Sequence, residues 1–174
     1  NEEAGIETDL TVVCIDKNHF RIISSAAVRT HDKAHILKHI SSEIEFKDIT
    51  DELVCLGLFG PLSRNLVSKL SNDNFSNDAF KFGTSKNIKI NDKIVWIQRL
   101  SYVGELGYEL YIKKEKAKEI YDLIISTGKD FSLTHCGAHT MDTMRMESGF
   151  VHWGHDISPE ENQYQAGLSF TISY

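Results

Sequence analysis

The sequence RLSYVGELGYE, residues 99–109, combines tyrosine, two glycines and two carboxylates in one short segment. Strand-like apolar residues precede it at 94–97 and overlap its end at 108–112. Two strands joined by a glycine-bearing turn form a β-hairpin. On such a hairpin we expect Tyr102 and Glu109 to lie on opposite arms, close enough to contact one ligand.

The pairing of a phenol with a carboxylate indicates a particular kind of ligand. A carboxylate accepts the hydrogens of an amino group and of a neighbouring ring N–H as a fork, which is a strong and directional contact. Tyr102 and Glu109 therefore suit a flat heterocycle with such an edge. The alternative is an ordinary cross-strand pair on a solvated sheet face. Glu105 is expected to be an exposed turn residue.

Composition limits the class of protein. The 174 residues are 41% apolar and 25% charged, which is typical of a folded soluble protein. The net charge of -6 argues against a broad nucleic-acid-binding face. No apolar run approaches the roughly 20 residues that span a membrane. We therefore expect neither nucleic acid nor membrane as a partner.

Cysteine usage favours a reducing compartment. The sequence has three cysteines, at Cys14, Cys55 and Cys136, and the odd number with wide spacing implies no disulfide framework. Cys14 and Cys55 lie in apolar strand-like segments and are expected to be reduced core residues. The expected location is cytoplasmic.

Hydrophobic spacing predicts an α+β fold with a mainly antiparallel sheet and flanking helices. The predicted strands cover residues 10–15, 20–23, 44–49, 53–59, 88–90, 94–100 and 108–112, and those at 88–90 and 94–100 are expected to pair around a turn at Asn91-Asp92. The predicted helices cover residues 30–39, 114–125 and 138–148. A further helix opens at Gly60-Pro61, with Leu62, Leu66, Val67 and Leu70 at helical spacing. No linker is evident, so residues 1–174 are expected to form a single unit, and both ends suggest a fragment of a longer polypeptide.

Two details of the helices can be tested directly. Ala34, Ile36, Leu37 and Ile40 form the apolar stripe expected on the helix over residues 30–39. Pro61 is expected at the first helical position, where its missing N–H would be unpaired anyway.

Asp9 stands where the chain enters a predicted buried strand. A carboxylate in that position can form a turn, cap a segment or serve a site.

Two clusters of histidines are candidate sites. His31, His35 and His39 recur every fourth residue, as metal ligands on one helix face would. No acidic or cysteine ligand accompanies them at helical spacing, so a solvated helix face is favoured. His135, Cys136 and His139 form a looser cluster in a turn-rich segment, where a Cys–His pair could form a nucleophile site, but their spacing gives this little support. We expect no metal site.

Four segments in order resemble the glycine-cleavage T-protein (aminomethyltransferase) family, and the similarity runs from residue 4 to residue 172. They are GIETDLTV at 5–12, YVGELGYE at 102–109, DTMRMESG at 142–149, and GHDI through AGL at 154–168. The sequence HWGH at 152–155 and Thr8 before Asp9 are more similar to the folate-binding portion of dimethylglycine and sarcosine dehydrogenases.

This resemblance implies a ferredoxin-like folate-binding domain. Its cofactor would be tetrahydrofolate, and its activity the transfer of a one-carbon unit from an aminomethyl or iminium donor. The resemblance implies that Glu109 grips the amino and ring N–H groups of the pterin, and that Tyr102 lies against the same ring. Asp9 would be the catalytic residue beside the accepting nitrogens. Phe170 replaces a tryptophan that is common in the family and keeps the capacity to stack.

The resemblance also implies binding partners, and one residue differs from the family pattern. The expected partners are folate, a methylamine-type donor, and a flavin domain or a lipoyl carrier protein. Met141 replaces a family arginine that could meet the glutamate tail of folate. The alternative function is a non-catalytic folate-fold binding or regulatory module. Asp9 favours the enzyme, because a pure binder needs Glu109 but not that acid.

Overall fold

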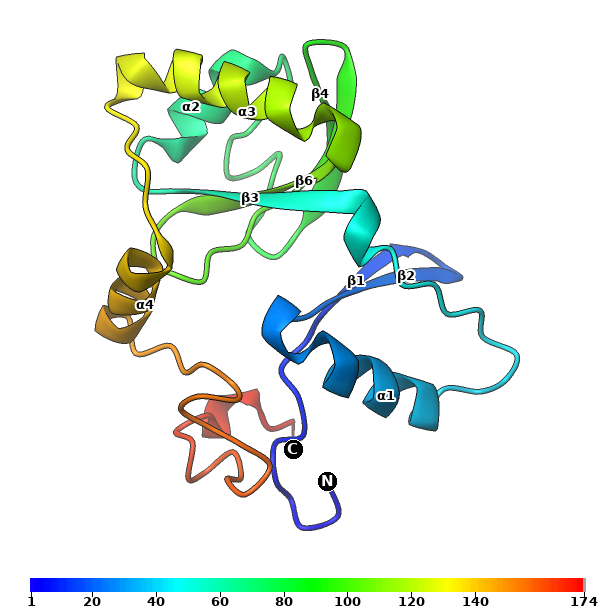
Figure 1. Ribbon diagram of the computed structural model, residues 1–174. Coiled ribbons are helices and arrows are strands. Elements are labelled where there is room, and N and C mark those ends of the chain that lie inside the picture. Colours follow the sequence, from blue (N-terminus) through cyan, green and yellow to red (C-terminus); the bar gives the residue numbers. More distant parts are fainter. Residues whose placement is uncertain (174) are drawn as a thin grey trace. The chain divides into compact units, whose positions relative to one another are not determined.

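The computed structural model describes residues 1–173, and these cluster into two compact units (Figure 1). The terminal unit combines Asn1–Lys47 with Val151–Tyr174, and the central unit is Asp48–Phe150. The single unit expected over residues 1–174 therefore has an internal division that no linker in the sequence predicts.

A four-stranded antiparallel sheet forms the frame of the central unit. Its strand order is β3-β6-β5-β4, so β6 is paired on both sides. The strands are β3 (Leu53–Phe59), β4 (Ser85–Ile90), β5 (Lys93–Gln98) and β6 (Gly107–Lys113). The helices of this unit are α2 (Ser63–Leu70), α3 (Lys114–Gly128) and α4 (Ala138–Glu147), with short 3₁₀ turns at Thr50–Glu52 and Lys129–Phe131. The predicted α+β class with a mainly antiparallel sheet is confirmed.

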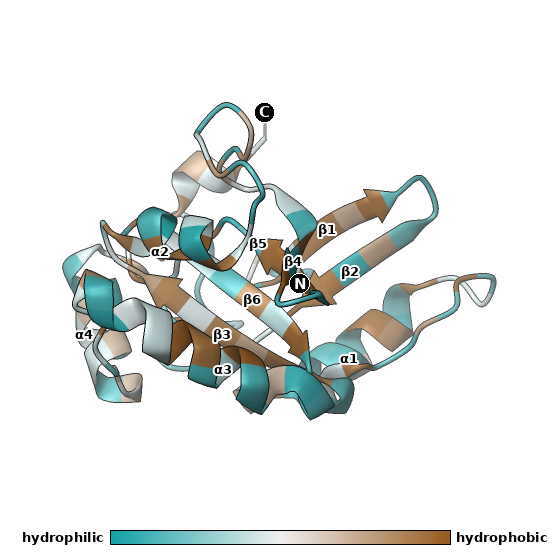
Figure 2. Ribbon diagram, turned by 90° about the horizontal axis from the view of Figure 1, so that it is seen from above, coloured by the Kyte–Doolittle hydropathy of each residue, from teal (hydrophilic) through white to brown (hydrophobic). Residues whose placement is uncertain are grey.

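One face of the sheet carries the hydrophobic core. Tyr108, Leu110 and Ile112 alternate along β6 and are almost completely buried. Helices α2 and α3 cover this face (Figure 1), and apolar residues at helical spacing, including Ile120 and Ile124 of α3, complete the core. In Figure 2 the resulting alternation of hydrophobic and hydrophilic residues follows α3 and β6. The period of two along β6 thus separates core residues from residues that are free for another role.

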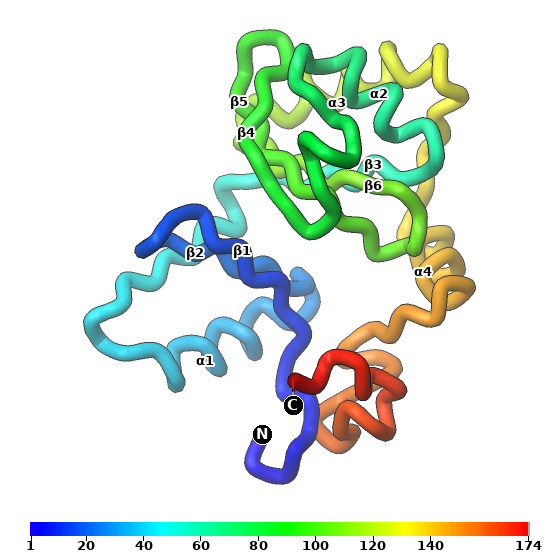
Figure 3. Tube along the Cα trace, turned by 180° about the vertical axis from the view of Figure 1, so that it is seen from behind, coloured from blue at the N-terminus to red at the C-terminus, as the bar shows by residue number. Residues whose placement is uncertain are grey.

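The hairpin between β4 and β5 turns on two residues, as the sequence predicts. Asn91 and Asp92 both have positive φ, at 46° and 63°. This is the backbone of the tight turns whose twist matches that of paired strands. Figure 3 shows the two strands running side by side from this turn.

The second predicted helix begins later than expected. Helix α2 starts at Ser63, so Pro61 lies two residues before it and not at its first position. Leu62 stays 49% exposed, whereas Leu66, Val67 and Leu70 are buried as the spacing predicts.

The terminal unit contains a small hairpin and one helix. Strand β1 (Thr11–Asp16) pairs antiparallel with β2 (His19–Ile23), and α1 (Arg29–His39) follows a 3₁₀ turn at Ala26–Val28. A last 3₁₀ turn covers Ser169–Thr171. None of the helices within residues 1–173 is both long and apolar enough to cross a lipid bilayer.

Two expectations for this part of the chain are wrong. Residues 44–49 form no strand, although their residues alternate as a strand requires. The predicted apolar stripe of α1 is not its buried face, because Leu37 is 48% exposed and Asp32, at 2%, is the buried residue of the helix.

The core role of β6 can be tested with Leu110→Ala. Leu110 is fully buried in the centre of the sheet, so the substitution should lower the free energy of unfolding by about 3 kcal/mol. Ile94→Ala, on β5 but 66% exposed, should change it by less than about 0.5 kcal/mol. Urea denaturation followed by tryptophan fluorescence measures both, and equal effects would contradict this account of the core.

Candidate functional site

The sheet face opposite the core brings polar and aromatic side chains together. Strand register places Gly57 and Gln98 directly beside Glu109, and Cys55 and Trp96 directly beside Tyr111. Because directly opposed residues point to the same side of a sheet, these side chains share one face. We call it the Glu109 face, and it comprises Cys55, Gly57, Trp96, Gln98, Glu109 and Tyr111.

Glu109 is half-buried and partly engaged. The hydroxyl of Tyr111 donates a hydrogen bond to Glu109 Oε2 over 2.6 Å. Within residues 1–173 this is the hydrogen bond that the carboxylate accepts, so Oε1 remains able to take a further donor. The carboxylate is thus held in position on one side and open to a ligand on the other.

Burial and the Glu109 charge keep the neighbours of this carboxylate protonated. Reduced hydration raises the pKa of Tyr111, and the proximity of Cys55 and Glu109 raises it further, so Tyr111 is a hydrogen-bond donor at neutral pH. Cys14 and Cys55 are both exposed, so the expectation that they are core residues is wrong. Nearby protein atoms still reduce the hydration of the Cys55 thiol. This desolvation and the Glu109 charge raise the pKa of Cys55 to about 11, against a lowering effect of its contact with Tyr111. Its thiol is therefore neutral and unreactive under ordinary conditions.

Aromatic rings flank the carboxylate. The rings of Trp96 and Tyr111 lie 4.7 Å apart between centroids. The ring of Phe59 lies over two glycines, since a Cβ added at Gly57 or Gly107 would come within 2.5 Å and 2.4 Å of it. Flat apolar surfaces around a carboxylate suit a planar ring that carries N–H groups.

Gln98 is the residue of this face that sequence reasoning missed. Its side chain is 1% exposed, and no group in the described part of the chain donates to its Oε1. An amide oxygen buried in this way is costly unless it receives a hydrogen bond. Together with the open oxygen of Glu109, it fits a heterocycle with several N–H donors.

Tyr102 does not lie on the strand opposite Glu109, where the sequence predicts it. Strands β5 and β6 form the predicted hairpin, but β5 ends at Gln98, and Tyr102 belongs to the long connecting loop. The residue opposite Glu109 on the other arm is Gln98. Tyr102 is half-buried, and its proposed ligand contact stays a prediction.

The connecting loop is fixed by the end of α4. The hydroxyl of Ser148 donates to the carbonyl of Val103 over 3.1 Å. Gly104 has a φ of +75°, and an added Cβ there would lie 2.0 Å from Ser148 Oγ. Glycine is therefore required for both conformation and space. The contact joins the sequence segments 102–109 and 142–149.

Asp9, in the terminal unit, is an exposed carboxylate, and the residue before it, Thr8, is held by a hydrogen bond. The hydroxyl of Thr8 donates to Oδ1 of buried Asp32 over 2.7 Å, and His31 Nδ1 lies 3.1 Å from the same oxygen. The indole of Trp153 donates to the carbonyl of Ile6 over 2.7 Å. The segment before Asp9 is thus held in place, while Asp9 itself faces solvent.

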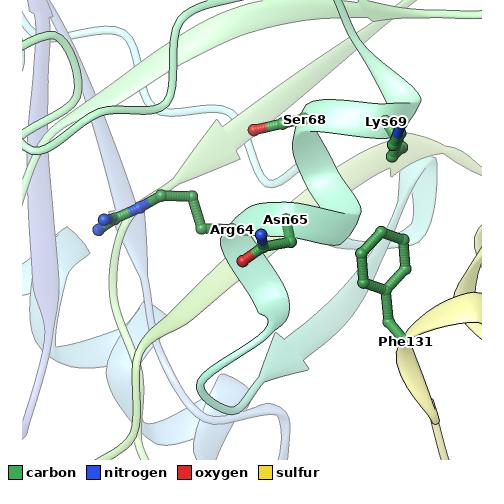
Figure 4. Close-up of a pocket in the computed structure, with 5 residues that line it drawn as sticks. All are labelled: Arg64, Asn65, Ser68, Lys69 and Phe131. Atoms are coloured by element: carbon green, nitrogen blue, oxygen red, sulfur yellow. The ribbon is translucent and has the colours of Figure 1, made fainter.

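The other residues and clusters predicted from the sequence do not form a second ligand or metal site within residues 1–173. Phe170 is 81% exposed on the last 3₁₀ turn, and its stacking role stays a prediction. No group of three His, Cys, Asp or Glu in residues 1–173 could hold a metal ion. An open hollow beside α2 contains none of the predicted residues; its lining is Arg64, Asn65, Ser68, Lys69 and Phe131 (Figure 4).

The fold is that of an α+β protein in which a carboxylate and aromatic side chains gather on one face of the sheet. The GCVT N-terminal domain model matches residues 1–174, and the chain belongs to this family. The resemblance to the glycine-cleavage T-protein group is therefore confirmed.

Individual relatives agree with this assignment. The chain is 37% identical to 4-methylaminobutanoate oxidase (formaldehyde-forming) of Paenarthrobacter nicotinovorans over 99% of its length, which is 21% of that protein. It is 33% identical to human mitochondrial dimethylglycine dehydrogenase over 96% of its length, or 20% of that protein. The chain therefore spans about a fifth of these relatives.

A solved structure shares the fold. The glycine cleavage system aminomethyltransferase T from Bartonella henselae superposes with a TM-score of 0.80 at 23% identity, covering 99% of this chain and 45% of that one. This likeness extends over both compact units and supports the fold described above.

The electrostatic coupling on the Glu109 face predicts the reactivity of Cys55. Glu109→Gln removes a negative charge that raises the thiol pKa, so the pKa should fall and alkylation by iodoacetamide at pH 8 should become several-fold faster. Because burial is the larger cause, Cys55 should still react slowly. Rates at each cysteine can be followed by mass spectrometry. Exposed Cys136 is the internal control, and an unchanged Cys55 rate would contradict the coupling.

Proposed function

We propose that this chain binds tetrahydrofolate on the Glu109 face and takes part in one-carbon transfer to it from an aminomethyl or iminium donor. The observation that supports this proposal most strongly is the position of Glu109. Its half-buried carboxylate is held by the Tyr111 hydroxyl, and its Oε1 is available to accept a hydrogen bond from a ligand. Membership of the GCVT family and the motif resemblance support the same ligand.

Recognition rests on the fork geometry of a carboxylate. Glu109 accepts the ring N–H and one amino hydrogen of the pterin edge, and a charge-assisted pair of this kind is stronger than neutral contacts. Phe59, Trp96 and Tyr111 supply apolar surface beside it. Tyr102 is proposed to contact the same ring system, and Phe170 keeps the capacity to stack on a ligand.

Asp9 is the proposed catalytic residue. When bound, tetrahydrofolate supplies the nitrogens that accept the one-carbon unit. Asp9 then holds the accepting amine or takes its proton, and general-base help of this kind contributes about 10²–10⁴ in rate. The Thr8–Asp32 hydrogen bond fixes the backbone just before Asp9, which supports a positioned carboxylate in place of a mobile one.

The source of the one-carbon unit is proposed from the relatives. The chain corresponds to about a fifth of an oxidase and a dehydrogenase whose names refer to methylated amines. A flavin domain that oxidises such an amine would provide the donor, and a lipoyl carrier protein is the other proposed source. A cytoplasmic location remains a proposal.

Folate binding can be tested with Glu109→Gln. The variant keeps an oxygen for Tyr111 but loses the charge that grips the ligand, so tetrahydrofolate affinity should fall about 10- to 100-fold. Titration followed by the fluorescence of Trp96 and Trp153 measures the change. Glu105→Gln, the same substitution at an exposed loop position, should leave affinity unchanged. Equal affinities in both variants would remove the basis of the proposal.

Catalysis can be tested separately with Asp9→Asn. Binding should persist, and formation of methylenetetrahydrofolate from a supplied aminomethyl or iminium donor, whose carbon needs no oxidation, should fall about 100-fold or more. Asp16→Asn is the matched control, since its side-chain oxygen can still accept from the Asn18 N–H. Unchanged turnover in Asp9→Asn would reject the catalytic role. Binding without any transfer in the unmodified chain would favour a non-catalytic folate-binding module.

A further inference from the structure

We infer that Gln98 is a specificity-determining residue that accepts the second hydrogen of the exocyclic amino group of the ligand. This inference rests on the proposed folate-binding function and deepens it. Two observations support it: Gln98 lies directly opposite Glu109 in the sheet, and its side chain is buried with an amide oxygen that is unsatisfied within residues 1–173. That side chain is 1% exposed, and its Oε1 receives no hydrogen bond from the residues that the structure describes.

The number of hydrogens on the ligand edge leads to this assignment. A ring N–H next to an amino group presents three hydrogens, and the fork at Glu109 takes the ring hydrogen and one amino hydrogen. In this fork geometry the second amino hydrogen points away from the carboxylate. It therefore needs another acceptor.

Register places that acceptor within reach. Side chains directly opposite on antiparallel strands have Cβ atoms about 5 Å apart, so Gln98 extends beside Glu109 on the same face. A glutamine carbonyl oxygen accepts hydrogen bonds without adding a second negative charge next to the carboxylate. Glu109 and Gln98 together then match all three hydrogens.

A purely structural role does not account for this side chain. The other fully buried residues of β5, Val95 and Ile97, are apolar and belong to the core on the opposite face. A glutamine retained for stability would be hydrogen-bonded, whereas an unsatisfied buried amide destabilises the chain in which it lies. Methionine has a similar length and shape without that penalty.

The test is Gln98→Met in the full chain, with two readouts of opposite sign. Thermal unfolding without ligand should shift upward by about 3 °C, because an unsatisfied buried group is removed. Affinity for tetrahydrofolate should fall about 5- to 10-fold, because one hydrogen bond to the ligand is lost. An analogue with a 2-methyl group in place of the 2-amino group should bind equally to the variant and the unmodified chain.

Asn65→Met is the matched control. Asn65 is an exposed amide on α2, which packs against the opposite face of the sheet, and its substitution should alter neither readout. A lower unfolding temperature in Gln98→Met with equal loss of both ligands would assign Gln98 a structural role and overturn the inference.

The outcomes also separate this inference from the proposed function. If the unmodified chain binds tetrahydrofolate, and Glu109→Gln weakens that binding while Gln98→Met leaves it unchanged, then Gln98 has no such role although the proposed function holds. If the unmodified chain does not bind tetrahydrofolate, both are overturned.

Discussion

The pairing of β6 on both of its edges is the constraint on which the site depends. A strand with neighbours on each side has its backbone hydrogen bonds committed, so its side chains can only alternate between the two faces. Leu110 is thereby placed in the core and Glu109 on the opposite face. A slip of one residue in register would exchange them, burying a carboxylate among apolar residues, and the core therefore fixes the orientation of the site.

The local patterns were predicted well from sequence, and the long-range ones were not. The turn at Asn91-Asp92 depends on neighbouring residues, and so does the alternation that places Glu109. The register of β5 against β6 depends on the whole loop between them, and so the partner of Glu109 is Gln98 and not Tyr102. The signal for Gln98 was present, since Trp96 and Gln98 share the period of two, but only the register reveals what they face.

The errors in the terminal unit have a related cause. Alternation at residues 44–49 is a necessary feature of a half-buried strand, yet a strand also requires a partner, and none pairs with these residues in the described part of the chain. In α1 the apolar spacing suggested a buried stripe, but the buried residue is Asp32, which Thr8 holds by a hydrogen bond. Polar anchoring of this kind has no periodic signature in sequence.

Stability and recognition make opposite demands on the Glu109 face. The core side of the same strands is filled by apolar side chains. The Glu109 face instead contains a half-buried carboxylate and a buried amide oxygen that receives no hydrogen bond within residues 1–173. Both groups are less favourable for folding than an apolar residue of equal size. Their juxtaposition, on a sheet whose other face already stabilises the unit, is what a ligand with several N–H donors would require.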